Sequence, residues 1–167
     1  MPVSRGGPEG RSLHGMARSW LRIRVELLSG MGMELEQPPG RVFAVAPSLT
    51  FARLAEEIDT AFGRWDLAHL HVFELGDGRR LGVPDDDPGE DAWLDDTAAK
   101  VGTELAPGDE FAYTFDLGDD WRHRCSVLGD NVDPRELLGE TPPGPVVLEG
   151  WGWLPDQYGR ETADEDD

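Results

Sequence analysis

Apolar and polar residues alternate along several short stretches of this chain, as they do in strands that bury one face. In the segment 20–28, Leu21 and Ile23 alternate with arginine and glutamate side chains. Residues 69–75 repeat this alternation, and residues 41–45 read as a returning strand between two turn-like stretches. These segments are therefore predicted to be strands of a sheet with one buried and one exposed face.

A helical period separates two of these strands. Between residues 49 and 62, apolar side chains recur every three or four positions, which predicts a long amphipathic helix. Ser48 is its expected N-cap, because a serine hydroxyl can accept a hydrogen bond from a free N–H group of the first turn. A shorter helix is expected near residues 97–105, with Asp96 or Thr97 as its cap.

The fold class that these elements predict is α+β, with a mainly antiparallel β-sheet packed against one long and one shorter helix. A single domain is expected over residues 19–160. Residues 1–18 are rich in Gly, Pro, Ser and Arg and lack an apolar period, so they are predicted to be a disordered extension. Met16 is an alternative to Met1 as the first residue. Residues 161–167 form a short acidic tail.

The stretch 111–127, FAYTFDLGDDWRHRCSV, predicts a β-hairpin around a Gly-Asp-Asp turn. Residues that pair across two antiparallel strands point to the same face, so the loop length must bring apolar side chains together. An even loop length would mix the two faces. A three-residue loop, 118–120, is therefore predicted, with Phe115 opposite His123. The shared buried face is expected to contain Phe111, Tyr113, Phe115, His123, Cys125 and Val127.

Charge and cysteine content narrow the classes of function. Asp and Glu number 34 against 15 Lys and Arg, which gives a formal net charge of −19. Such a surface repels phosphate, so direct binding of nucleic acid is not expected. The single cysteine cannot form an internal disulfide, and no apolar run approaches the roughly 20 residues that span a bilayer. A soluble, cytoplasmic protein without a membrane partner is predicted.

Histidines and aspartates supply one candidate functional cluster: His69, His71, Asp119, Asp120 and His123. His69 and His71 form an H-x-H pair on one strand, a geometry that metal sites use when further ligands converge. Imidazole with carboxylate suits zinc or another first-row divalent ion, which is the only cofactor that the sequence suggests. The alternative, which we favour, is structural. Leu70 and Val72 would face the core beside half-exposed histidines, and His123 would be a neutral, hydrogen-bonded side chain.

Aromatic residues near the C-terminus supply a second candidate site: Trp151, Trp153 and Tyr158. These side chains can cover the edge of the core, or they can form an exposed patch that binds a protein partner. Large aromatic residues dominate burial in small domains, so the sequence favours core cover.

Three blocks of the chain, residues 20–28, 49–73 and 105–127, resemble the plasmid pRiA ORF-three-like family, also labelled TnpR-like or element-passenger proteins. The resemblance implies a mobile-element association. Its DNA-related labels conflict with the acidic composition, because a recombinase needs an activated serine and a basic DNA-binding region. Residues 129–160 depart from the family, whose members carry a cysteine-containing segment followed by a Pro-Pro-Glu-Asp and paired-glycine motif there. This chain has no cysteine in that segment and reads PPGPVVLEGWGWLPDQYGR at 142–160.

No nucleophile–base pair, phosphate-binding loop or complete set of metal ligands is visible in the sequence. An enzymatic role is therefore not expected. The function predicted from the sequence is a non-catalytic protein-interaction module. The alternative is a metal-binding protein or metal-dependent hydrolase that uses the histidine–aspartate cluster.

Overall fold

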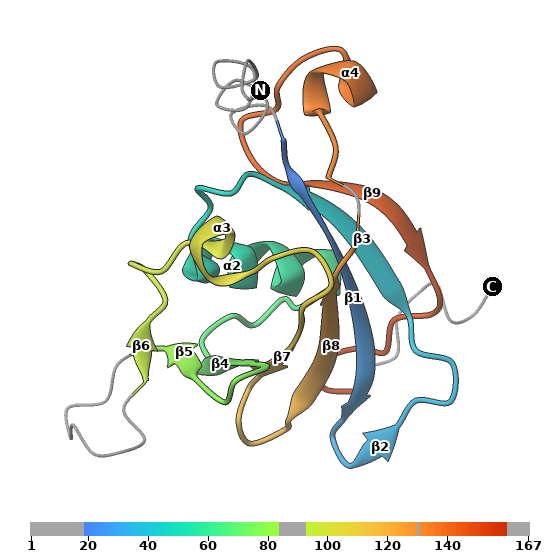
Figure 1. Ribbon diagram of the computed structural model, residues 1–167. Coiled ribbons are helices and arrows are strands. Elements are labelled where there is room, and N and C mark those ends of the chain that lie inside the picture. The colour runs from blue at the N-terminus through green and yellow to red at the C-terminus, as the bar shows by residue number, and fades with distance from the viewer. Residues whose placement is uncertain (1–18, 84–92, 130, 160–167) are drawn as a thin grey trace, which may run out of the picture.

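The computed structural model describes residues 19–83, 93–129 and 131–159 of the 167-residue chain. The predicted extension at residues 1–18 and the acidic tail at 161–167 lie outside the described residues. Within the described part, nine strands form one sheet and three helices accompany it (Figure 1). No helix of this part is long and apolar enough to cross a membrane.

The strands follow the order β6-β5-β4-β7-β8-β1-β3-β9 across the sheet, and β2 pairs with β1. Each neighbouring pair is antiparallel except β5 and β6, so the predicted antiparallel character is confirmed. The strands are β1 (Leu21–Gly30), β2 (Met33–Glu34), β3 (Gly40–Val45), β4 (His71–Leu75), β5 (Arg80–Gly82), β6 (Leu94–Asp95), β7 (Glu110–Phe115), β8 (Trp121–Val127) and β9 (Val146–Trp151). The helices are α2 (Phe51–Ala61), α3 (Val101–Glu104) and α4 (Pro134–Leu138).

The prediction of one long and one shorter helix is wrong, because the described residues contain a third helix, α4. Its signals are local: the Asp133 side chain accepts a hydrogen bond from the Arg135 N–H, and Pro134 begins the helix. Gly139 ends it in the left-handed conformation, with φ of 87°. The helix has only five residues, too few to produce an apolar period.

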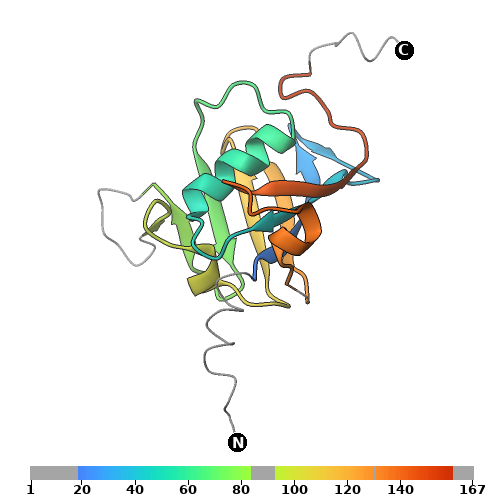
Figure 2. The same ribbon diagram turned by 90° about the horizontal axis from the view of Figure 1, so that it is seen from above.

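Helix α2 lies across one face of the sheet (Figures 1 and 2). Its apolar side packs into the core with Phe51, Leu54 and Ile58, none of which has exposed surface. The N-cap is Thr50, whose side chain accepts a hydrogen bond from the Arg53 N–H at 3.2 Å. The expected Ser48 cap is therefore wrong by two residues, because Ser48 lies outside the helix and Thr50 directly precedes it.

The alternation in the first predicted strand matches β1. Ile23, Val25 and Leu27 have no exposed surface, whereas Arg24 on the opposite face is exposed. The same separation holds along β8, where Arg122 and Arg124 are exposed, Ser126 is half-buried and the alternate side chains are buried. Helix and core therefore lie on one face of the sheet, and a charged face lies on the other.

The hairpin of β7 and β8 has the predicted buried face but a different register. Tyr113, rather than Phe115, lies opposite His123, and Phe115 lies opposite Trp121. The loop contains five residues, 116–120, instead of three. Both loop lengths are odd, so alternation alone keeps the same side chains on the same face and cannot distinguish them.

Turn chemistry explains the longer loop. Asp116 adopts a left-handed conformation with φ of 62°, and its carboxylate accepts hydrogen bonds from the N–H groups of Gly118 and Asp119. Trp121 then enters the core with no exposed surface, over Gly30 of β1. A Cβ atom at Gly30 would lie 2.0 Å from the Trp121 ring, so only glycine fits there.

Candidate functional site

His123 is buried in the core and is held by two hydrogen bonds. Its Nε2 atom lies 3.3 Å from Arg64 Nη2, and its Nδ1 atom lies 3.0 Å from the Tyr113 carbonyl oxygen. A guanidinium group only donates, so Nε2 accepts and Nδ1 carries the proton. Burial, assisted by the charge of Arg64, lowers the pKa of His123 to about 3. The side chain is thus the neutral, hydrogen-bonded histidine of the structural interpretation.

A buried polar network surrounds this histidine. Arg64 is 5% exposed, donates to the Phe62 carbonyl oxygen at 2.8 Å and stacks 4.7 Å from the Trp121 ring centroid. The Tyr113 hydroxyl donates to Asp59 Oδ1 at 2.7 Å. Burial raises the pKa of Asp59 to about 7, opposed by its hydrogen bond to Tyr113 and by the charge of Arg64.

Asp59 and Arg64 are not among the functional residues that the sequence pattern predicts. Asp59 lies four residues after buried Ala55, so its position on the apolar side of the 49–62 helix could have indicated burial. No comparable signal marks Arg64, which follows the helix and enters the core only because the chain turns at Gly63.

His71 pairs with a buried carboxylate. Its Nε2 atom lies 2.6 Å from Asp96 Oδ2, and Asp96 is only 2% exposed. The expectation that Leu70 and Val72 face the core is wrong, since Phe73 is buried and Leu70 is 59% exposed. His71 shares the core-facing side of β4 with Phe73, because residues two apart on a strand point the same way.

His69 lies at a different place, near the end of the hairpin. Its Nε2 atom is 2.6 Å from the Tyr158 hydroxyl, which donates to Asp66 Oδ2 at 2.7 Å. Its Nδ1 atom is 3.5 Å from Asp116 Oδ2. The hydrogen bond with Asp66 is the main cause that raises the pKa of Tyr158 to about 12 and also lowers the pKa of the Asp66 carboxyl.

The two aspartates of the predicted cluster take separate roles. The Asp119 N–H bonds to the Asp116 carboxylate, and its carbonyl oxygen accepts from the Met31 N–H at 2.7 Å. Asp120 Oδ2 lies 3.5 Å from Arg122. The three histidines therefore have three different sets of partners. Across the part of the chain that the structure describes, no three His, Cys, Asp or Glu side chains are arranged to hold a metal ion.

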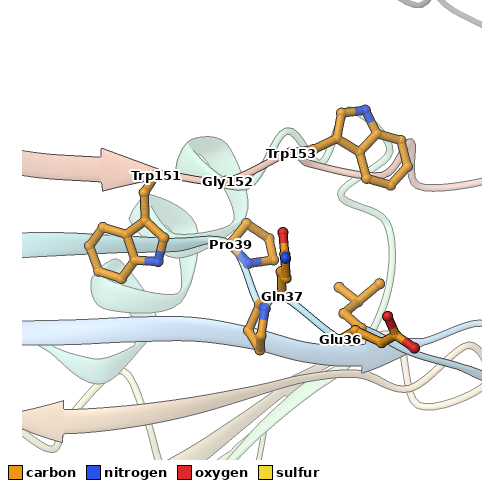
Figure 3. A pocket seen from close by; sticks show the side chains of 8 residues that line it. Glu36, Gln37, Pro39, Trp151, Gly152 and Trp153 are labelled. Atoms are coloured by element: carbon orange, nitrogen blue, oxygen red, sulfur yellow. The ribbon is translucent and has the colours of Figure 1, made fainter.

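The second candidate site contains an open groove of about 570 Å³ between residues 35–39 and 151–153. We call it the tryptophan groove. Figure 3 shows Pro39 and Gln37 between the two indole side chains. Trp153 is 64% exposed, whereas Trp151 is partly buried. The sequence favours core cover for all three aromatics, and this does not fit Trp153. The partly buried Trp151 ring lies over Gly40 and beside Arg24, on the charged face of the sheet rather than among the core residues.

Glycines bring the walls of this groove together. The Trp151 ring lies over Gly40 of the neighbouring strand, where a Cβ atom would be 2.2 Å from the indole. At Gly152, with φ of 89°, a Cβ atom would lie 2.6 Å from the Pro39 Cα atom. Tyr158 does not line the groove. Its hydroxyl instead lies 2.6 Å from His69 Nε2. The predicted patch is thus divided between two places.

Comparisons with known proteins identify a family and a related fold. The family model of the plasmid pRiA4b ORF-3-like protein matches residues 21–156. The fold is similar to the crystal structure of a protein of unknown function, MM3350, from Methanosarcina mazei Go1, with a TM-score of 0.63. That match has 21% sequence identity and covers 79% of this chain and 69% of the other. No curated protein matches the chain.

Proposed function

The chain belongs to the plasmid pRiA4b ORF-3-like family, and we propose that this member is a cytoplasmic, non-catalytic α+β module that binds a protein partner through the tryptophan groove. The observation that carries the proposal is Trp153, a side chain that is 64% exposed in a groove already lined by Trp151 and two prolines. Burying an indole against a partner is strongly favourable, and tryptophan is enriched among the residues that dominate binding energy.

The occupant that we propose is an extended segment that carries proline or another apolar side chain next to a lysine or arginine. Grooves lined by aromatic residues bind extended, proline-containing segments, whose backbone is already ordered before binding. Glu36 lines the groove, and the whole chain has a net charge of −19. A basic segment is therefore attracted, and its cation can stack on the Trp153 ring.

The groove is held in place before any partner arrives. The Leu27 N–H donates to the Pro39 carbonyl oxygen at 2.9 Å, which fixes one wall. Arg41 Nη1 donates to the Trp151 carbonyl oxygen at 3.1 Å, and the Arg24 guanidinium lies 5.0 Å from the Trp151 ring centroid. A fixed groove loses less conformational entropy on binding than a mobile one.

Peptide titrations followed by tryptophan fluorescence test the proposal. The probe is a short synthetic peptide of proline, leucine and arginine, compared with the same peptide carrying glutamate in place of each arginine. We expect the basic peptide to bind and the acidic peptide not to bind. Trp153→Ala should weaken binding at least about tenfold, which corresponds to about 1.4 kcal/mol.

Leu137→Ala is the matched control, because Leu137 is 52% exposed on α4 and does not line the groove. This variant should bind the basic peptide as the natural chain does. Equal affinity in the natural chain and in Trp153→Ala would show that the groove is not the contact site. Equal affinity for both peptides would contradict the proposed basic partner.

A further inference from the structure

A second exposed apolar surface lies around His69, where three loops meet. Its large apolar side chains have exposed fractions between 37% and 59%: Trp65, Leu67, Leu70, Leu117 and Tyr158. We call it the His69 surface. None of these residues lines the tryptophan groove. Large apolar side chains scattered singly on a surface are ordinary, but a group of five on adjoining loops marks an interaction site.

Hydrogen bonds join the three loops into one surface. The Asp116 N–H donates to the Leu70 carbonyl oxygen at 2.8 Å, which connects the hairpin turn to the loop before β4. The Tyr158 hydroxyl contacts both His69 and Asp66, which connects the C-terminal segment to the same loop. The loops that carry these apolar side chains therefore lie side by side although they come from distant parts of the sequence.

Buried Gln157 fixes this arrangement. Its Oε1 atom accepts hydrogen bonds from the Trp65 and Asp66 N–H groups at 2.9 and 3.0 Å. Its Nε2 atom donates to the Asp66 carbonyl oxygen at 2.8 Å, and the side chain has no exposed surface. The Trp65 and Tyr158 rings meet edge to face, with centroids 5.0 Å apart. Because these loops are already ordered in the free protein, less conformational entropy is lost when a partner binds.

The loops that form this surface are predominantly acidic, and Asp120 pairs with Arg122 of β8. The segments 65–70, 116–120 and 154–159 contain five aspartates and no lysine or arginine. A second copy of this chain is a poor occupant, because an interface between identical surfaces would bring aspartates to face aspartates. Nucleic acid is repelled for the same reason. A partner with clustered lysine or arginine matches the charge.

We propose that the His69 surface binds a basic segment of a partner protein whose apolar side chains cover Trp65, Leu67, Leu70, Leu117 and Tyr158. Its lysine or arginine side chains pair with the surrounding aspartates. This site is separate from the tryptophan groove and does not depend on it.

Calorimetric titration with a synthetic amphipathic peptide of leucine and lysine tests the proposal. The decisive variant is Leu67→Ser/Leu70→Ser/Leu117→Ser, whose residues are all exposed. The matched control is Leu137→Ser/Leu138→Ser on α4, at 52% and 45% exposure. We expect the first variant to weaken binding at least about tenfold and the control to leave it unchanged. Thermal melts of both variants should follow the natural chain, so that a loss of binding is not a loss of fold.

The first two outcomes below would overturn this proposal, and the last would overturn only the proposal for the tryptophan groove. An equal change of affinity in the two variants, or no change in either, would show a general attraction of lysine to an acidic chain. Loss of binding in Trp153→Ala would place the leucine–lysine peptide in the tryptophan groove. In the last outcome, the proline–arginine peptide fails to bind while the leucine–lysine peptide still binds and loses affinity in the triple-serine variant. That result would contradict only the proposal for the tryptophan groove.

Discussion

Asp59 and His123 are buried ionisable residues whose effects on stability oppose each other as pH changes. Burial raises the pKa of Asp59 from 3.8 to about 7, so the folded state holds a proton that the unfolded state loses. The contribution of Asp59 to the free energy of unfolding therefore falls as pH rises from 3.8 to about 7. Burial lowers the pKa of His123 from 6.5 to about 3, so stability is lost as pH falls from 6.5 to about 3. Between pH 3.8 and 6.5 the two effects act in opposite directions.

Asp59→Asn removes one of these opposing effects. The asparagine Oδ1 atom can still accept from the Tyr113 hydroxyl, so we expect the variant to fold. Its free energy of unfolding, relative to the natural chain, should increase as pH rises from 3.8 to about 7. Urea denaturation at a series of pH values measures this difference. A difference that does not change with pH would show that Asp59 does not titrate in this range.

Phe115→Ala tests the packing of the hairpin against the core. Phe115 is 1% exposed, and truncation of a buried phenylalanine costs about 3–5 kcal/mol because it leaves a cavity. Leu137→Ala is the control, since its side chain is 52% exposed and its loss should change stability by less than about 0.5 kcal/mol. Chemical denaturation of both variants gives the comparison. Similar stabilities for the two variants would contradict the burial of Phe115.

At the scale of elements, the turn between β7 and β8 depends on one side chain. Asp116 has φ of 62°, and its carboxylate bonds to the N–H groups of Gly118 and Asp119 at 3.1 and 3.2 Å. Asparagine and aspartate tolerate the left-handed conformation better than alanine does. The residue therefore supplies both the backbone shape and the acceptor that the turn needs.

Asp116→Ala should lower the free energy of unfolding by about 1–3 kcal/mol, because it leaves unpaired N–H groups and a strained backbone. Asp116→Asn keeps an acceptor and the tolerated conformation, so it should cost less. Thermal and urea unfolding of the two variants would show which of them is more stable. If alanine were as stable as asparagine at this position, the turn would not depend on the Asp116 side chain.

The same turn shows which features of a hairpin its sequence pattern predicts and which it does not. Alternation correctly placed Phe111, Tyr113 and Cys125 on one buried face. It could not choose between odd loop lengths, because a shift of two residues leaves each side chain on the same face. The short strands β2, β5 and β6 have two or three residues, too few for any period to be visible.

For the whole molecule, the positions of the histidines bear on the alternative function of metal binding. His69, His71 and His123 each have different partners, namely Tyr158, Asp96 and Arg64. A divalent ion needs several ligands at one point. The arrangement of the described residues therefore favours structural roles.

Protein purified without a polyhistidine tag should retain no zinc and should not compete for zinc with a chromophoric chelator. The physical reason is the separation of the imidazoles, each of which is already hydrogen-bonded. His69→Ala/His71→Ala should leave this result unchanged. One zinc ion per chain, lost in the double variant, would support the metal-binding alternative and contradict the structural interpretation.

The sequence by itself determined the family, the alternating strands, the long helix and the side chains on the buried face of the hairpin. These features depend on the periods of local backbone structure, which are visible in consecutive residues. Only the tertiary structure decided that Arg64 enters the core beside His123, that the histidines separate, and that Tyr158 joins His69 while Trp153 remains exposed. Contacts of this kind join residues such as His69 and Tyr158, which are 89 positions apart. Their geometry depends on how the loops and strand edges pack together, and no local period records it.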